Sequence, residues 1–229
     1  AQALFESWFV DFEPFQDGEF EDSELGRIPK GWKVRTVKDI SRDVICGKTP
    51  STRDKGNYGG LMPFITIPDM RGHTYVARTE RHLSERGIAT QRNKTLPKNS
   101  VVVSCIATPG LVSLTAEKSQ TNQQINSILC RDEISHFFAF LYMRRLGPKI
   151  RDLGSGGSTT LNLNKTQFSR IKLIVPRVEV LDEFNHLVEP LFEKTLDNQL
   201  QTQALEAIRD TLLPKLMSGQ IRVPLEGGA

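Results

Sequence analysis

The stretch VEVLDEFNHLVEPLFEKTLDNQLQTQALEAIRDTLL, residues 178–213, decides the architecture, because its apolar residues recur every three or four positions. This spacing is typical of an α-helix with one apolar face, and a helix of this length reaches roughly 54 Å. Two interleaved sets repeat every seven residues: Phe184, Leu191, Asn198, Leu205 and Leu212, and Leu181, Val188, Thr195, Thr202 and Arg209. Such a pair of sets is typical of a coiled coil, here with a polar middle.

This long helix is expected to pack against a partner helix. It outruns a single domain, whose radius of gyration would be about 13–15 Å, so its apolar face needs a second helix. The residues that we expect to face the partner are Leu181, Phe184, Val188, Leu191, Leu205 and Leu212. Pro190 is expected to kink the helix near its start. The alternative is a helix that folds back on its own domain.

Charge is segregated along the chain. Residues 1–26 contain eight acidic and no basic side chains, whereas residues 27–177 contain 26 basic and ten acidic ones. Residues 178–229 are acidic again, with nine acidic and four basic side chains. The basic middle favours a polyanionic partner, because each phosphate that Lys or Arg neutralises releases a condensed counterion. The alternative is a solvated basic surface that binds nothing.

Short runs rich in Val, Ile and Thr predict a domain with several strands and few helices over residues 27–176. The expected strands are Trp32–Val37, Phe64–Ile67, Val101–Ile106, Leu111–Thr115, Ile125–Cys130 and Arg170–Val175. One helix is expected over Ile134–Leu153, with Gly147-Pro148 bending or interrupting it. The fold class is therefore a mixed α/β (α+β) domain followed by the long helix.

The N-terminal stretch is predicted to be the end of another amphipathic helix. Its aromatic residues share one helical face: Phe5, Trp8, Phe9 and Phe12. Pro14 ends this helix, an acidic linker follows, and residues 26–31 are typical of a turn. Residues 3–9 also resemble residues 207–213 in pattern, so we expect the chain to be cut from a tandem arrangement or to be a half-length form. Trp8 and Trp32 are expected to pack.

The sequence argues against several other classes of protein. The cysteines and histidines have no metal-ligand spacing: Cys46, Cys105, Cys130, His73, His82, His136 and His186. We therefore expect no metal, and free buried thiols in a reducing cytoplasm. No apolar run is long enough to span a membrane.

Nor does the sequence contain a complete catalytic motif. Gly47-Lys48-Thr49 resembles the end of a phosphate-binding P-loop, but Arg42 stands where that motif needs its first glycine. No Asn/Asp-Pro-Pro-Tyr/Phe methylation motif and no Asp…Glu-x-Lys nuclease arrangement is present. We expect no cofactor, and catalysis on partner proteins.

Six stretches together resemble the specificity subunits of type I restriction–modification enzymes. In the order of that family, they are Leu4–Phe12, Gly26–Trp32, Thr121–Asn126, Gly157–Asn164, Ile171–Pro176 and Leu212–Arg222. The first and last resemble the ends of two conserved helices, and the other four resemble the start, the internal motifs and the end of a target recognition domain.

The resemblance implies a non-catalytic protein that binds double-stranded DNA in the cytoplasm. It implies two recognition domains per full subunit, separated by antiparallel conserved helices that dock methyltransferase subunits and, through them, a restriction subunit. This chain holds one such domain: 1–26 would be the end of a helix and a linker, 27–176 the recognition domain, 177–221 the spacer helix and 222–229 a tail. A homodimer through the long helix would restore the full plan and read a bipartite site.

The polar loop over residues 47–60 is the first candidate for contacting DNA, since its side chains suit base edges and phosphates. The candidate residues are Lys48, Thr49, Ser51, Arg53, Lys55 and Tyr58, followed by Arg71, Gln123, Gln124, Thr159 and Lys165. Amides also cross-link loops, and the glycine-rich run over residues 154–160 could be a simple hinge or could approach phosphates.

Two other functions remain open on sequence grounds. One is a helical adaptor whose basic domain reads no sequence, which sequence-independent binding would favour. The other is an enzyme fragment with a hidden nuclease site, which metal-dependent cleavage by the isolated chain would favour.

Overall fold

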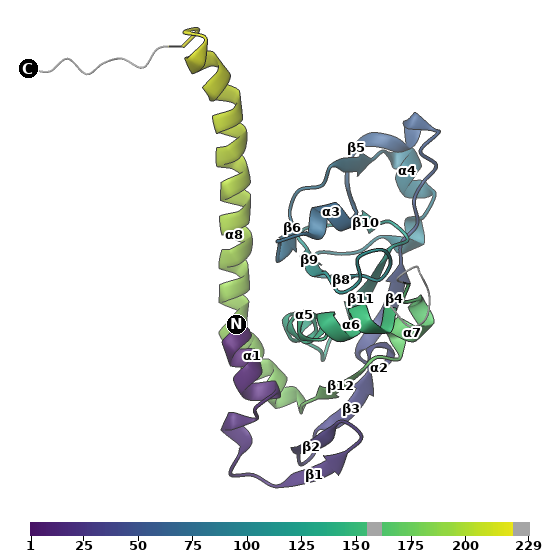
Figure 1. Ribbon diagram of the computed structural model, residues 1–229, viewed down its shortest axis with the longest axis vertical. Coiled ribbons are helices and arrows are strands. Elements are labelled where there is room, and N and C mark those ends of the chain that lie inside the picture. Colours follow the sequence, from purple (N-terminus) through teal and green to yellow (C-terminus); the bar gives the residue numbers. More distant parts are fainter. Residues whose placement is uncertain (155–161, 222–229) are drawn as a thin grey trace, which may run out of the picture.

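A five-stranded sheet forms the centre of the domain in the computed structural model, which describes residues 1–154 and 162–221. The sheet order is β4-β11-β8-β9-β6, and its neighbours are antiparallel except β6 and β9. Its strands are β4 (Ser41–Cys46), β6 (Tyr75–Val76), β8 (Val101–Ser104), β9 (Val112–Thr115) and β11 (Ile125–Cys130). Figure 1 shows this sheet in the middle of the domain, with α8 along one side.

The two faces of this sheet bury two different cores. Successive side chains of a strand point to opposite faces, so Val101 and Val103 enter the larger core and Val102 enters the smaller one. The smaller core lies toward a three-stranded sheet of β5 (Tyr58–Ile65), β7 (Arg81–Leu83) and β10 (Gln120–Thr121). Four short α-helices lie in the connections between the strands: α2 (Val37–Ile40), α3 (Ile67–Met70), α4 (Glu85–Ala89) and α7 (Lys165–Ser169). Three 3₁₀ turns accompany them: η1 (Glu13–Phe15), η2 (Lys55–Asn57) and η3 (Arg92–Lys94).

The larger core joins the sheet to three helices, α1 (Gln2–Phe9), α5 (His136–Arg145) and the start of α8 (Val178–Met217). Aromatic rings hold these helices together. The Phe9 ring lies 4.8 Å from Phe184 of α8, 5.0 Å from Phe138 of α5 and 5.8 Å from Trp32, between ring centroids. The prediction that the first residues form an amphipathic helix, and that Trp32 packs, is confirmed.

Two small ribbons lie at the base of the domain, and one of them corrects the sequence prediction. The expected acidic linker contains β1 (Phe20–Ser23), and the expected turn contains β2 (Gly26–Pro29), which pairs with it. The second ribbon pairs β3 (Lys33–Thr36) with β12 (Lys172–Val175), antiparallel. A strand near the start of the domain and the strand at its end are therefore neighbours.

Most of the predicted elements are present, although several boundaries differ. The expected helix over Ile134–Leu153 is split into α5 and α6 (Gly147–Gly154), which confirms the interruption at Gly147-Pro148. The expected strand Phe64–Ile67 was placed too late, because β5 starts at Tyr58 and Ile67 already begins α3. The mixed α/β class followed by a long helix is confirmed.

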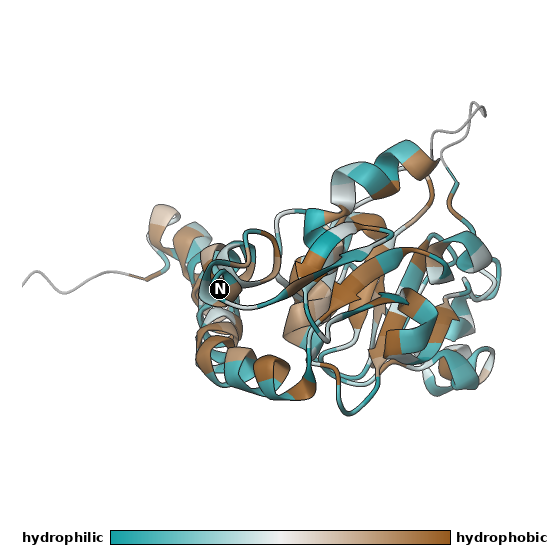
Figure 2. Cartoon of the chain, turned by 90° about the horizontal axis from the view of Figure 1, so that it is seen from below, coloured by the Kyte–Doolittle hydropathy of each residue, from teal (hydrophilic) through white to brown (hydrophobic). Residues whose placement is uncertain are grey.

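Helix α8 has a buried half and an exposed half. Six residues spaced mostly four apart are buried against the domain: Val180, Leu181, Phe184, Val188, Phe192 and Leu196. By contrast, Leu191, Leu205 and Leu212 are 51%, 66% and 41% exposed. Three of the six residues expected to face a partner helix, Leu181, Phe184 and Val188, thus pack inside the chain's own core instead. Viewed from below, Figure 2 shows hydrophobic segments gathered inside the domain and recurring along α8.

None of the helices in the described ranges is both long enough and apolar enough to cross a membrane.

Candidate nucleic-acid interface

The polar loop predicted from the sequence begins at the end of β4, where the neighbouring backbone leaves no space for a side chain at Gly47. A Cβ at Gly47 would lie 2.2 Å from the carbonyl oxygen of Asn122, so only glycine fits there. The Lys48 N–H donates to the Thr121 carbonyl at 3.1 Å, and Lys94 Nζ donates to the Cys46 carbonyl at 2.7 Å. The start of the loop is therefore fixed against the turn before β11.

Two predicted site residues from distant parts of the sequence meet at this point. The Thr49 hydroxyl donates to the side-chain carbonyl of Gln123, which is itself exposed. Gln124 behaves differently, since its side-chain oxygen accepts a hydrogen bond from Asn122 Nδ2 at 3.0 Å. Gln123 is therefore accessible to a ligand, whereas Gln124 serves at least partly to shape the turn.

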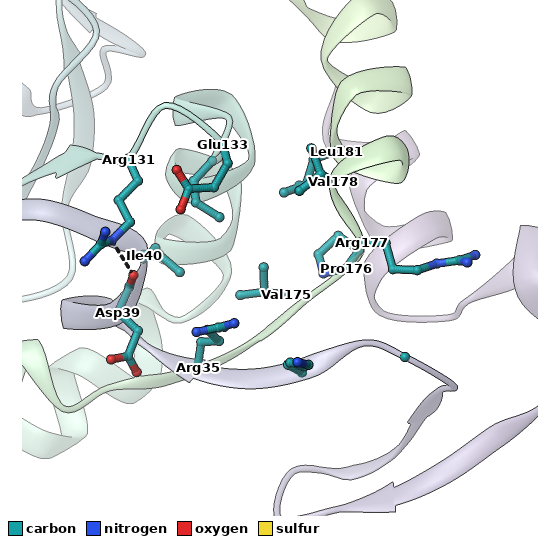
Figure 3. Close-up of a pocket in the computed structure, with 13 residues that line it drawn as sticks. Arg35, Asp39, Ile40, Arg131, Glu133, Val175, Pro176, Arg177, Val178 and Leu181 are labelled. Atoms are coloured by element: carbon teal, nitrogen blue, oxygen red, sulfur yellow. Dashed lines mark hydrogen bonds between the residues drawn. The ribbon is translucent and has the colours of Figure 1, made fainter.

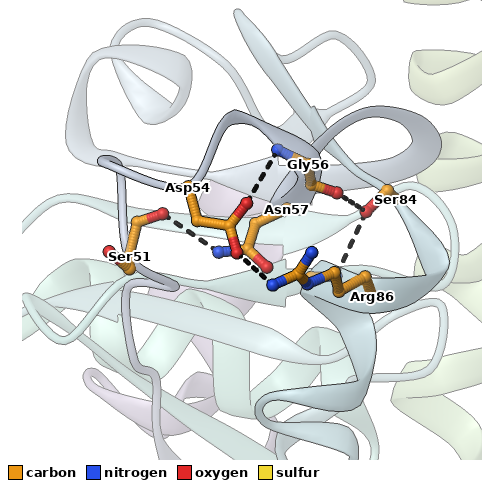
Figure 4. Close-up of polar contacts among 7 residues, drawn as sticks. Ser51, Asp54, Gly56, Asn57, Ser84 and Arg86 are labelled. Carbon is orange, nitrogen blue, oxygen red and sulfur yellow. Dashed lines mark hydrogen bonds and ion pairs between the residues drawn. The ribbon is translucent and has the colours of Figure 1, made fainter.

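The far end of the loop is tied to α4 by a polar network, shown in Figure 4. Asp54 accepts from the Gly56 N–H at 3.1 Å and forms an ion pair with Arg86 at 2.5 Å. Ser84 Oγ donates to the Gly56 carbonyl at 2.6 Å. The buried Asn57 donates from Nδ2 to the Ser51 carbonyl at 3.0 Å. These contacts hold the loop in one shape without using the side chain of Ser51.

The remaining predicted loop residues divide into exposed cations and one packed aromatic. Lys48, Arg53 and Lys55 are exposed, and within the described part of the chain their side chains have no hydrogen bond or salt bridge. The half-buried Tyr58 donates its hydroxyl hydrogen to the Pro50 carbonyl at 2.7 Å, and the Arg81 guanidinium lies 5.9 Å from its ring centroid. Tyr58 therefore supports the loop.

Two more of the predicted residues, Arg71 and Lys165, are described by the structure and do not join this cluster. Arg71 is exposed and follows α3 beside β9, because Ser113 Oγ donates to the carbonyls of its neighbours Met70 and His73. It therefore lies toward the β6 edge of the sheet, opposite β4. Lys165 begins α7, and its Nζ is 3.9 Å from Asp43 of β4. Thr159 lies outside the described residues.

Sequence reasoning missed a basic surface beside β4, whose residues are scattered along the chain. Arg131 lines three adjoining hollows and donates from Nε to the Asp39 main-chain carbonyl at 2.9 Å. The hollow in Figure 3 has a volume of about 430 Å³ and is lined by Arg35 and Arg177, although the Arg177 side chain extends away from the other labelled residues. The only available signal was the general excess of Lys and Arg.

Burial shifts the pKa of several titratable groups in the interior. Burial raises the pKa of both Cys105 and Cys130 to about 12, so these thiols stay protonated. Burial, with the nearby Lys98 charge, lowers the pKa of His136 to about 4. Among the described residues, no group of three or more His, Cys, Asp or Glu side chains could hold a metal ion.

Comparison with known proteins places this fold and loop in a family. Residues 29–205 match the type I restriction modification DNA specificity domain, so the chain belongs to that family. It is 38% identical to the type I restriction enzyme HindI specificity subunit of Haemophilus influenzae, over 96% of this chain and 61% of that protein. It is 29% identical to the MjaIX specificity subunit of Methanocaldococcus jannaschii, over 97% of this chain and 52% of that protein.

Solved structures support the same fold. The HsdS subunit from Thermoanaerobacter tengcongensis superimposes with a TM-score of 0.58 at 16% identity, over 93% of this chain and 49% of that one. This chain thus spans between about half and three-fifths of the lengths of these relatives.

Proposed function

We propose that this chain supplies one of the recognition domains of a type I restriction–modification specificity subunit, binds double-stranded DNA in the cytoplasm and performs no catalysis. The observation that carries the proposal is the convergence of Lys48, Thr49 and Gln123 in one rigid loop cluster. Lys can hold phosphates or read guanine, and Gln can pair with adenine N6 and N7. Membership of a family of DNA specificity domains supports the same function.

We further propose that the exposed half of α8 pairs with a second helix in an antiparallel coiled coil. Leu205, Ile208, Leu212 and Leu216 are between 39% and 66% exposed and recur three or four residues apart, which makes one apolar stripe. In a homodimer this stripe would place two recognition domains on one split DNA site. The same helices would dock methyltransferase subunits and, through them, a restriction subunit.

DNA selection with a randomised duplex pool, followed by fluorescence anisotropy on the selected duplex, tests the DNA-reading function. The expected outcome is a preferred sequence and a steep loss of affinity between about 50 and 200 mM salt. Gln123→Ala should then cost about 1–3 kcal/mol of discrimination at one base pair. Gln203→Ala, on α8, is the matched control. Sequence-independent binding would favour a helical adaptor, and metal-dependent cleavage would favour a nuclease.

Sedimentation of the chain tests the homodimer. We expect a dimer that Leu205→Glu dissociates, because the charge would be buried in the apolar stripe. The control Ala207→Glu adds the same charge at an exposed position two residues later, which lies on the opposite face of the helix. A monomer at all accessible concentrations would refute self-pairing and would leave a different helix as the partner.

A further inference from the structure

The groove between α2, β4 and α7 concentrates positive charge on the same side of the domain as the loop. It has a volume of about 660 Å³, and five cationic side chains line it against two carboxylates, Asp39 and Asp43. The cations are Lys38, Arg42, Arg131, Lys165 and Arg170. Figure 1 shows α2, α7 and β4 together on the side of the domain away from α8.

A β-bulge aims Arg42 into this groove. The β4–β11 pairing matches Asp43 with Leu129 and Ser41 with Cys130, so Arg42 has no partner residue. Both Arg42 and Asp43 are consequently exposed, although adjacent residues of a regular strand point to opposite faces. Bulges at sheet edges commonly redirect a side chain. Charge on an edge strand also prevents edge-to-edge pairing, but that role would not require an excess of one sign.

The two carboxylates do not neutralise the groove. Asp39 accepts hydrogen bonds from the Thr36 N–H at 2.8 Å and the Thr36 hydroxyl at 2.6 Å, so it is engaged in capping α2. Asp43 faces Lys165 at 3.9 Å, the longest of the ion pairs between described residues. Lys38, Arg42 and Arg170 have no side-chain hydrogen bond or salt bridge within residues 1–154 and 162–221.

We propose that this groove binds the phosphate backbone of the same duplex that the loop reads, an inference that rests on the proposed function. The groove lies beside the first residues of β4, and the loop begins where β4 ends. Arg42 and Lys48 are six residues apart, about 20 Å in extended chain, which matches roughly six base-pair steps along the axis of a duplex. The groove fixes the position of the duplex, and the loop discriminates between bases.

The test compares two pairs of substitutions in the full chain. The groove variant is Arg42→Gln with Arg170→Gln. The control, Arg144→Gln with Lys194→Gln, removes the same charge from exposed positions on α5 and α8 that do not line the groove. Anisotropy is measured on a random-sequence duplex and on the selected duplex at several salt concentrations.

We expect the groove variant to weaken binding to both duplexes by the same factor and to reduce the slope of log affinity against log salt by about one per lost phosphate contact. The control should keep the slope of the unmodified chain. As a measurement without substitution, DNA should protect Lys38 and Lys165, but not Lys194, from acetylation read by mass spectrometry.

Three outcomes separate the two claims. If the unmodified chain binds DNA but the groove variant keeps its slope and neither lysine is protected, the phosphate groove is refuted and the DNA-reading function stands. If the groove variant loses discrimination at one base pair instead of affinity at all sequences, the groove reads bases and the proposal is overturned. If the unmodified chain does not bind DNA, both claims fail.

Discussion

The side-chain amide of Gln199 on α8 forms two hydrogen bonds with the main chain of Tyr75 on β6. The Tyr75 N–H donates to Gln199 Oε1 at 3.1 Å, and Gln199 Nε2 donates to the Tyr75 carbonyl at 3.2 Å. Because β6 is at the edge of the five-stranded sheet, the amide occupies the place of the next strand. This contact holds α8 against the domain just beyond Leu196, the last buried apolar residue of the helix within the described residues.

Replacing Gln199 should loosen that attachment without unfolding the domain. We expect Gln199→Ala to lower the free energy of unfolding by only about 1 kcal/mol. Hydrogen exchange of the Tyr75 amide should accelerate strongly, because its acceptor is removed. The control Asn198→Ala changes the exposed neighbour. Unchanged exchange at Tyr75 would mean that water replaces the amide without loss.

The aromatic junction of α1, α5 and α8 should be the most sensitive part of the core. Phe184 is fully buried and packs against Phe5, Trp8 and Phe9. We expect Phe184→Ala to cost about 3–5 kcal/mol in urea unfolding. Leu187→Ala, at a position 49% exposed, should cost less than about 1 kcal/mol. Equal costs would contradict the assignment of the buried face.

Gly47 should be essential for the shape of the loop. The Cβ of Gly47→Ala would overlap the Asn122 carbonyl, so the start of the loop must shift. We expect base discrimination to fall while overall stability drops by about 1–3 kcal/mol. Gly59→Ala is the control for steric overlap, since nothing lies within 4 Å of a Cβ there, although its φ of 84° adds strain. Normal discrimination in Gly47→Ala would show that the loop adapts.

The free energy of unfolding should fall as the pH drops through the range in which His136 titrates. Its pKa is about 4 in the fold against 6.5 in the unfolded chain, because burial disfavours the charged form. Between these values the unfolded state binds more protons, so stability falls as the pH drops from 6.5 toward 4. We expect a loss of roughly 1–3 kcal/mol across this window, partly abolished in His136→Gln. The same slope in both proteins would assign the loss to other groups.

The sequence predicts those elements whose pattern of apolar and polar residues is contained in one continuous stretch of chain. The period of α8, the alternation of apolar and polar residues in Trp32–Val37 and the helix break at Gly147-Pro148 are local patterns, and all are present. Strand β4 was missed because its bulge makes Arg42 and Asp43 consecutive exposed residues, which breaks the alternation.

The loop of the candidate site is predictable from the sequence, whereas most of the groove is not, because only the loop is one continuous polar stretch. The loop residues Lys48 and Thr49 are contiguous and polar, so they were visible in the sequence. The groove cations come from three separate segments, and only the folding of α7 against β4 brings Lys165 near Arg42. Likewise, the heptad pattern of α8 cannot tell that Phe184 packs on its own domain whereas Leu205 does not.

The pairing of β3 with β12 has a consequence for how this protein can change. Val34 lies opposite Ile174 at the base of the domain, so the chain enters and leaves the domain at one ribbon. Everything from residue 37 to residue 171 is a closed excursion from that ribbon. Genetic exchange of such an excursion would replace the reading surface while α1 and α8 keep their mutual packing. Under the proposed function, the geometry thus allows a new specificity to be acquired in one recombination event, provided that the exchanged residues again supply a helix that packs on α1 as α5 does.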